Sequence, residues 1–355
     1  MKKNVYWISL LIASLSFSTN AFSGDHSKGK ESYLEGQQAV LDAFGWDFKK
    51  AEITIEKINE NNHVLFGLGG NILVNSGTDG VLIVDDQFPQ LKNKIILITG
   101  GASGIGRIMS RLSLEKNAKV IIWDINTQNI ENTLKELSTL GNISSYVVDI
   151  SEIRQIEKTA QQLKKEHGNI DILINNAGIV VGKYFHEHSS AEIDKTLNIN
   201  SSAPMHICNQ FLSIMMQNNS GHICNIASSA SLVANPKMSV YAASKWAVFG
   251  WSDSLRLEMK QLKKNIKVTT ILPYYINTGM FDGVKSRIPI LNDEYAALTI
   301  IKAIEKNKKI ITIPGWIYRF TRFGQTVMSV NAFDWFAGSV MGIYKTMNDF
   351  RGRNN

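Results

Sequence analysis

The sequence predicts an α/β fold: a doubly wound parallel sheet, preceded by a short β-rich segment and followed by a helical extension. Apolar runs of strand length alternate with helix-length amphipathic segments, and this alternation continues with short connections from about Lys94 to Pro314. Parallel strands that are buried on both faces form continuous apolar runs, and repeated strand–helix alternation places helices on both faces of one sheet. We therefore expect one domain over residues 93–314 that holds a seven-stranded sheet.

The expected elements follow in chain order. Apolar runs predict strands at residues 95–98, 120–123, 146–148, 170–174, 222–227, 268–272 and 310–313. Amphipathic segments between them predict helices, most clearly at residues 129–140, 153–166 and 240–262.

The residues before this domain have a different pattern. Short apolar segments at 53–57, 64–74 and 81–84 predict antiparallel strands linked by glycine turns, notably at 75–80. The stretch 63–87 resembles the opening strands of the metallo-β-lactamase fold, on the basis of Gly69-Gly70-Asn71 and residues 79–86. We therefore expect residues 24–92 to form a truncated, β-rich version of that fold.

The metallo-β-lactamase family needs a His-x-His-x-Asp-His cluster that holds zinc and activates water. The nearest sequence is His186-Glu187-His188, but Ser190 and Ala191 stand where the aspartate and third histidine belong. We therefore expect these histidines to be surface loop residues and predict no metal site.

The N-terminus has the layout of a secretory signal peptide. Lys2 and Lys3 precede an apolar stretch at residues 5–17, and small residues at 21–23 offer a cleavage point. The alternative is a single membrane anchor, although the apolar run is short for a full span. Residues 1–23 are thus expected to be a signal peptide.

Composition excludes some classes of partner. A formal charge of +7 over 355 residues, without basic runs interleaved with aromatics, gives no reason to expect nucleic-acid binding. The two cysteines, Cys208 and Cys224, fall in the predicted core without metal-ligand spacing, and we expect no structural disulfide.

The chain after Pro314 is a further appendage, residues 315–355. It is rich in aromatic residues and methionine and carries Arg319 and Arg322. We expect a helical pair that closes a substrate pocket, because an apolar stripe at helical spacing usually packs on its own domain. Interfacial contact with a membrane surface is the alternative.

A glycine-rich turn, Gly100-x-x-x-Gly104-x-Gly106, follows the first strand of the expected domain and opens a helix. Glycine permits positive φ and removes the Cβ that would block a pyrophosphate, and a helix N-terminus favours phosphate charge. Ser103 and Ile105 lie in the same turn. This pattern predicts a dinucleotide site.

Asp124 ends the second strand, near the spacing expected of a carboxylate that bonds the ribose hydroxyls. A carboxylate there accepts from the 2′-OH and repels a 2′-phosphate, which favours NAD over NADP. Asn126 and Thr127 follow, so Asp124 could instead cap a helix, and Arg107 could favour a phosphate. The NAD preference is therefore a prediction.

Tyr241 and Lys245 are four residues apart on an expected helix, and Ser228 stands thirteen residues before the tyrosine. A phenol with a pKa near 10 is a poor base at neutral pH, so it needs a nearby positive charge. Lys245, one helical turn on, would provide that charge. Ser228 would orient a substrate hydroxyl or carbonyl and stabilise oxyanion charge.

These residues together resemble the short-chain dehydrogenase/reductase family, whose motifs occur here in order: the glycine turn, Asn175-Asn176-Ala177-Gly178, Ser228 and Tyr241-x-x-x-Lys245. The resemblance covers about residues 94–314 and implies a Rossmann fold in which Tyr241 is the general acid/base and Lys245 bonds the nicotinamide ribose.

The same resemblance assigns further roles. Asn200 would hold a water that links the lysine to solvent; Asn198 is a close alternative, but the small residues 201–203 follow Asn200 as in the family pattern. Tyr274 departs from the family, which commonly has glycine there, and this puts the substrate shape in doubt. The resemblance would also place further residues against the cofactor: Asp149 at the adenine, Asn176, Ala177 and Gly178 along its length, and Ile276 and Thr278 at the carboxamide.

Residues 123–126, 278–281 and 332–350 are similar to the retinol and 17β-hydroxysteroid dehydrogenase branch of the family. This implies an apolar alcohol or carbonyl substrate, such as a retinoid, a steroid or a long-chain alcohol. The resemblance to the wider family implies a homodimer or homotetramer. The alternatives are an NADPH-dependent carbonyl reductase and a non-functional fusion that carries a hydrolase remnant. Localisation stays open, because the signal peptide predicts export whereas nicotinamide cofactors are plentiful in the cytoplasm.

Overall fold

The computed structural model describes residues 54–57, 62–67, 70–77, 80–85 and 91–352. Contacts divide the chain into two units, residues 1–86 and 87–355. The expected signal peptide, residues 1–23, lies outside the described residues, as does the first part of the expected β-rich segment.

The first unit contains a four-stranded antiparallel sheet in the order β1-β2-β3-β4, formed by β1 (Thr54–Lys57), β2 (Asn62–Gly67), β3 (Gly70–Gly77) and β4 (Gly80–Asp85). The single strand expected at 64–74 is therefore wrong: β2 and β3 pair as a hairpin up to Gly67 and Gly70. Glycines at this point of the sequence permit the reversal that the apolar pattern concealed. The resemblance of this segment to the metallo-β-lactamase fold remains a prediction.

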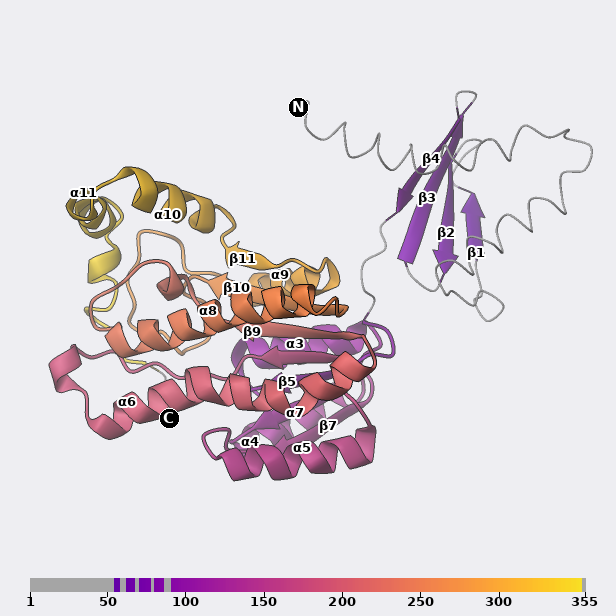
Figure 1. Cartoon of the computed structure of the whole chain (residues 1–355), viewed down its shortest axis with the longest axis horizontal. Coiled ribbons are helices and arrows are strands. Elements are labelled where there is room, and N and C mark those ends of the chain that lie inside the picture. Colours follow the sequence, from indigo (N-terminus) through magenta and orange to yellow (C-terminus); the bar gives the residue numbers. More distant parts are fainter. Residues whose placement is uncertain (1–53, 58–61, 68–69, 78–79, 86–90, 353–355) are drawn as a thin grey trace, which may run out of the picture. The chain divides into compact units, whose positions relative to one another are not determined.

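The second unit confirms the doubly wound parallel sheet. Seven parallel strands lie in the order β11-β10-β9-β8-β5-β6-β7, so the chain reverses its direction of travel across the sheet between β5 and β8 (Figure 1). Ligands bind at such a switch point, outside the carboxyl ends of the strands. The strands are β5 (Ile95–Thr99), β6 (Lys119–Asp124), β7 (Ile143–Val147), β8 (Ile172–Asn175), β9 (Gly221–Ile226), β10 (Ile266–Pro273) and β11 (Ile310–Ile313).

Helices cover both faces of this sheet. Alternate residues of β5 show why: Ile96 and Ile98 pack in one core cluster with residues of α3, α4 and α9, whereas Leu97 packs in a second cluster with residues of α5 and α7. The helices are α3 (Gly104–Glu115), α4 (Thr127–Leu137), α5 (Ile153–His167), α6 (Ser190–Leu197), α7 (Ala203–Gln217), α8 (Ser239–Gln261) and α9 (Asp293–Glu305). Cys208 and Cys224 belong to different clusters, and both are free thiols.

The C-terminal extension is helical, as expected. It contains α10 (Trp316–Val327), α11 (Val330–Trp335), a π-helical turn η6 (Phe336–Val340) and a 3₁₀ turn η7 (Ile343–Lys345). Figure 1 shows α10 and α11 on the side of this unit away from α4 and α5. Within the described residues, no helix combines the length and the apolar character that a membrane span requires.

Candidate functional site

The turn between β5 and α3 needs its glycines. Gly100 and Gly104 have φ values of +62° and +51°, a region that other residues rarely adopt. A Cβ on Gly106 would lie 2.0 Å from the Gly100 carbonyl oxygen, so only glycine allows the turn to fold against the helix. The turn therefore leaves the N-terminus of α3 open toward the carboxyl end of the sheet.

The segment after β8 holds this turn in place. Asn176 Nδ2 donates to the carbonyl oxygens of Thr99 (3.0 Å) and Gly100 (3.2 Å). The Thr99 hydroxyl oxygen in return accepts from the backbone N–H groups of Asn176 (3.0 Å) and Ala177 (3.1 Å). Asn176 and Ala177 thus fix two neighbouring strand ends at the switch point.

Asp124 is the last residue of β6, and Asp149 follows β7 two residues after that strand ends. Asp124 is buried, and its carboxylate accepts from the backbone N–H groups of Ala102 (3.1 Å) and Asn126 (3.1 Å). The N-cap of α4 is Asn126, which accepts from Asn129 N, so Asp124 is not the cap. Asp149 accepts from the backbone N–H (2.9 Å) and hydroxyl (2.6 Å) of Ser151.

Tyr241, Lys245 and Ser228 are buried close to one another. The first two lie one turn apart on α8, and Ser228 follows β9, where its hydroxyl oxygen accepts from Ala230 N at 3.1 Å. Burial raises the pKa of Tyr241 to about 12, while its hydrogen bond with Ser228 acts in the opposite direction. Burial, rather than the Lys245 cation, therefore dominates the pKa of the phenol.

Lys245 is buried beside the tyrosine. Its Nζ donates to the Ile226 carbonyl oxygen at 2.9 Å and lies 5.9 Å from the centroid of the Tyr241 ring. Burial lowers the pKa of Lys245 to about 8. The ammonium of Lys245 is thus held near the phenol, and it loses a proton more readily than the ammonium of an exposed lysine does.

Asn200 lies in a π-helical turn, η4 (Asn198–Ser202), a form found often at functional sites. Its Nδ2 donates to Ile179 O (2.9 Å) and Ser244 Oγ (3.0 Å), and its Oδ1 accepts from Ile179 N (2.8 Å). A Cβ built on Gly178 would lie 3.2 Å from Asn200 Oδ1 and 3.4 Å from Lys245 Nζ, so both groups border the same point. The side chain of Asn198 instead donates to Ser151 O.

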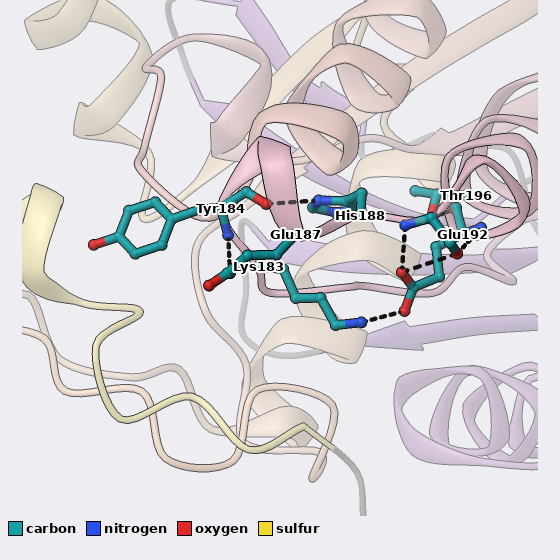
Figure 2. Close-up of polar contacts among 7 residues, drawn as sticks. Lys183, Tyr184, Glu187, His188, Glu192 and Thr196 are labelled. Carbon is teal, nitrogen blue, oxygen red and sulfur yellow. Dashed lines mark hydrogen bonds and ion pairs between the residues drawn. The ribbon is translucent and has the colours of Figure 1, made fainter.

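Figure 2 shows polar contacts around the start of α6, the helix that the π-helical turn directly follows in the chain. Ser189 caps the helix, and the Glu192 carboxylate accepts from the Ser189 backbone N–H at 3.0 Å. The ammonium of Lys183, 2.5 Å from Glu192, and the bond from Ser189 lower the pKa of Glu192 to about 2. These contacts fix the start of the segment that ends in Asn200.

One cavity of about 880 Å³ joins the glycine turn to the tyrosine and continues to the C-terminal extension. Every predicted site residue lines it except Gly106 and Asn200. Those that line it are Gly100, Ser103, Gly104, Ile105, Asp124, Asp149, Asn176, Ala177, Gly178, Ser228, Tyr241, Lys245, Ile276 and Thr278.

The far end of the cavity is apolar and was not assigned residue by residue from the sequence. The ring of Phe281 meets Tyr241 edge-on at 6.1 Å between centroids and Tyr275 at 5.0 Å. The C-terminal extension supplies much of the remaining wall, through Trp316, Ile317, Phe320, Phe333, Phe336, Ala337, Met341 and Ile343. The helical spacing of apolar residues in the extension was the sequence signal for this lining. Closure of a substrate pocket by these helices stays a prediction.

The chain was compared with known proteins. The family model described as short chain dehydrogenase matches residues 94–288. Epidermal retinol dehydrogenase 2 of Mus musculus is 33% identical over 278 residues, 76% of this chain and 89% of the relative. Human 17-beta-hydroxysteroid dehydrogenase 13 is 34% identical over 232 residues, 64% of this chain and 77% of the relative.

Solved structures share the fold. A short-chain dehydrogenase/reductase from Burkholderia phymatum in complex with NAD has a TM-score of 0.61 at 23% identity, covering 66% of this chain and 93% of that one. A metagenomic short-chain oxidoreductase in complex with NADP has a TM-score of 0.54 at 24% identity, covering 63% of this chain and 96% of that one.

Proposed function

The chain belongs to the short-chain dehydrogenase/reductase family of NAD(P)-binding oxidoreductases, and from this premise we propose that it is an NAD-dependent dehydrogenase of apolar alcohols, with Tyr241 as general acid/base. The observation that carries the proposal is the continuous cavity, which connects the glycine turn before α3, the group of Ser228, Tyr241 and Lys245, and an apolar end. A nicotinamide cofactor, when bound, supplies or accepts the hydride.

The residues at the first end of the cavity fit a dinucleotide. The turn between β5 and α3 has no Cβ at Gly100, Gly101, Gly104 or Gly106, where the backbone turns or packs closely. The first turn of α3 carries no acidic side chain. The N-terminus of α3 would therefore hold the pyrophosphate. Asp149 and Ile150 line the region where the adenine would lie.

Asp124 supports NAD as the cofactor. Each of its oxygens accepts one backbone hydrogen bond and has a further lone pair for a ribose hydroxyl. A 2′-phosphate at the same place would meet a buried carboxylate of like charge. Arg107, which could favour a phosphate, forms an ion pair with Glu136 at 3.0 Å. An NADPH-dependent carbonyl reductase is the alternative.

The chain's own groups would handle the proton. Ser228 would donate a hydrogen bond to the substrate oxygen, and Tyr241 would give its phenol proton to that oxygen in reduction or accept a proton there in oxidation. Burial favours the protonated phenol, so oxidation needs the nearby Lys245 cation to stabilise the phenolate.

Asn200 would complete a route for protons from Lys245. Both N–H groups of its amide are used by Ile179 and Ser244, but Oδ1 accepts only one of its two hydrogen bonds. The remaining lone pair could accept from a water that also contacts Lys245. Asn200 is thus a positioning residue whose effect passes through the lysine.

The apolar end of the cavity supports a substrate such as a retinoid, a steroid or a long-chain alcohol. Phe281 lies against Tyr241, Met280 and Val180 also line the cavity, and the C-terminal extension adds aromatic residues. The matched relatives named as retinol and 17-beta-hydroxysteroid dehydrogenases agree with this class.

A panel of retinoid, steroid and long-chain alcohols, each with NAD and with NADP, would test the proposal. Tyr241→Phe should reduce kcat by at least about a thousandfold, because it removes the transferable proton but leaves the ring. The control Tyr295→Phe changes an exposed tyrosine on α9 and should retain full activity. Turnover that survives Tyr241→Phe would exclude the tyrosine mechanism, and a preference for NADP would exclude the role of Asp124.

A further inference from the structure

Helix α10 is apolar on two faces. Ile317 and Thr321 are buried against the domain, whereas Trp316, Phe320, Phe323 and Val327 form a second stripe in solvent, with exposed fractions of 46%, 44%, 67% and 60%. The spacings of four, three and four residues place these four side chains on one helix face. Val330 and Trp335 of α11, 77% and 63% exposed, follow directly. We call these six residues the C-terminal stripe.

The C-terminal stripe is continuous with the cavity. Trp316 and Phe320 line the cavity and are also half-exposed on the surface, with their rings 5.6 Å apart in an edge-on contact. Phe320 also contacts Phe336, another lining residue, at 5.8 Å between ring centroids. The apolar end of the cavity thus reaches the surface at the stripe, and contiguous exposed apolar surface of this kind marks an interaction site.

Positive charge accompanies the stripe. Arg319 and Arg322 are exposed on α10, and the guanidinium of Arg322 lies 5.6 Å from the Tyr318 ring centroid. Asp334 is the one acidic residue in the sequence between Trp316 and Trp335, and its carboxylate accepts from the Tyr344 hydroxyl at 2.6 Å. Aromatic and aliphatic residues beside arginines, with few acidic residues, are typical of a helix that lies in the interface of an anionic bilayer.

We propose that the C-terminal stripe binds an anionic lipid surface, so that the mouth of the cavity opens toward the acyl chains and an apolar substrate enters from the lipid. Pairing of the stripe with a second copy of this chain is disfavoured, because a symmetric contact would bring Arg319 and Arg322 of one copy against those of the other. The binding of the stripe to lipid does not depend on the proposed enzymatic activity. The entry of substrate from the lipid does depend on that proposed function.

A fluorescent probe on the stripe tests the binding. The native cysteines are buried, so a cysteine introduced by Phe323→Cys can be labelled selectively in the full chain with an environment-sensitive dye. The matched control is Leu257→Cys, an exposed apolar site on α8. Vesicles of phosphatidylcholine with phosphatidylglycerol, carrying nitroxide-labelled acyl chains, should shift and quench the probe at 323 but not at 257.

Because residues 1–23 are present in every variant, attachment through the N-terminus does not change between the two labelled proteins. A probe at 323 that stays in water, at a lipid concentration that sediments the protein, overturns the proposal. Protection of the probe that depends on protein concentration without vesicles also overturns it, and identifies a second copy as the partner.

Substitution tests the entry of substrate. Phe323→Glu with Val327→Glu changes two stripe residues outside the cavity wall, and loss of two apolar side chains should weaken partitioning at least about a hundredfold. Turnover of a short, water-soluble alcohol should be unchanged. Turnover of a long-chain alcohol presented in the same vesicles should fall at least about tenfold.

Leu257→Glu is the control for this pair and should leave both rates unchanged. Equal rates on vesicle-borne alcohol in the stripe variant and the unmodified chain would overturn entry from the lipid. If neither alcohol is turned over, the proposed function fails, while the probe at position 323 still decides lipid binding.

Discussion

Replacing Lys245 with methionine should stabilise the folded protein slightly at neutral pH while it abolishes turnover. Burial lowers the pKa of Lys245 from 10.5 to about 8, so holding its charge inside the domain costs roughly 3 kcal/mol at pH 7 relative to the unfolded chain. Methionine removes this cost, but it leaves the Ile226 carbonyl without the lysine as a donor, which costs about 1–3 kcal/mol. The expected net gain is about 1 kcal/mol.

The pH dependence of this difference is the sharper test. The folded pKa lies below the unfolded one, so between pH 8 and 10.5 the unfolded chain binds more protons and the stability of the unmodified protein rises with pH. From pH 7 to 9.5 this rise is about 2 kcal/mol, and the methionine variant lacks it. The stability of the variant relative to the unmodified protein should therefore fall by the same amount.

Urea unfolding without cofactor, at both pH values, measures the difference. Lys158→Met, at an exposed position of α5, controls for loss of a lysine elsewhere and should show no such change with pH. A difference between the Lys245→Met and unmodified proteins that stays constant from pH 7 to 9.5 would refute the reasoning. In that case the buried ammonium would have compensating contacts, and its depressed pKa would not exist.

Three further predictions concern the cofactor site and the core. Asp124→Asn should weaken NAD binding at least about tenfold and improve NADP binding, measured by titration of both cofactors; unchanged preference would contradict the role of the carboxylate. Gly106→Ala should weaken cofactor binding at least about tenfold because its Cβ would strike the Gly100 carbonyl oxygen, whereas Gly250→Ala, with open space around it, should not. Burial lowers the pKa of His222 to about 4, so stability should fall as pH drops from 6.5 toward 4, by about 2 kcal/mol between pH 7 and 5. His222→Gln should remove this loss in urea unfolding, and a loss that persists would assign it to other groups.

The sheet was predictable because its central strands are buried on both faces and therefore read as unbroken apolar runs. β6 was expected at 120–123 and extends over Lys119–Asp124. At the edge of the sheet this signal weakens: β7 was expected at 146–148 but spans Ile143–Val147, since Ser144 and Ser145 are only half-buried there. α4 was expected at 129–140 but spans Thr127–Leu137, and its earlier start follows from Asn126, which caps the helix.

The order of the motifs along the sequence was enough to predict the residues of the candidate site. It did not show which of two nearby residues takes a given role. Asn198 and Asn200 differ by two positions. Only the structure of the π-helical turn shows that Asn200 borders the same point near Gly178 as Lys245 Nζ, while Asn198 donates to Ser151. The same holds for Asp124, where the sequence left ribose binding and helix capping open. Side-chain direction decided that Asn126 is the cap.

By itself, the sequence determined the doubly wound sheet, the glycine turn at its switch point and the hydroxyl, phenol and ammonium beside it. These depend on local period, glycine conformation and spacing along one helix, all of which are short-range properties. Only the tertiary structure decided that Phe281 and the C-terminal extension form the wall of the same cavity, and that α10 keeps a second apolar face in solvent. Which face of a helix is buried depends on the segments that pack against it in the folded domain. The local spacing of apolar residues does not identify those segments.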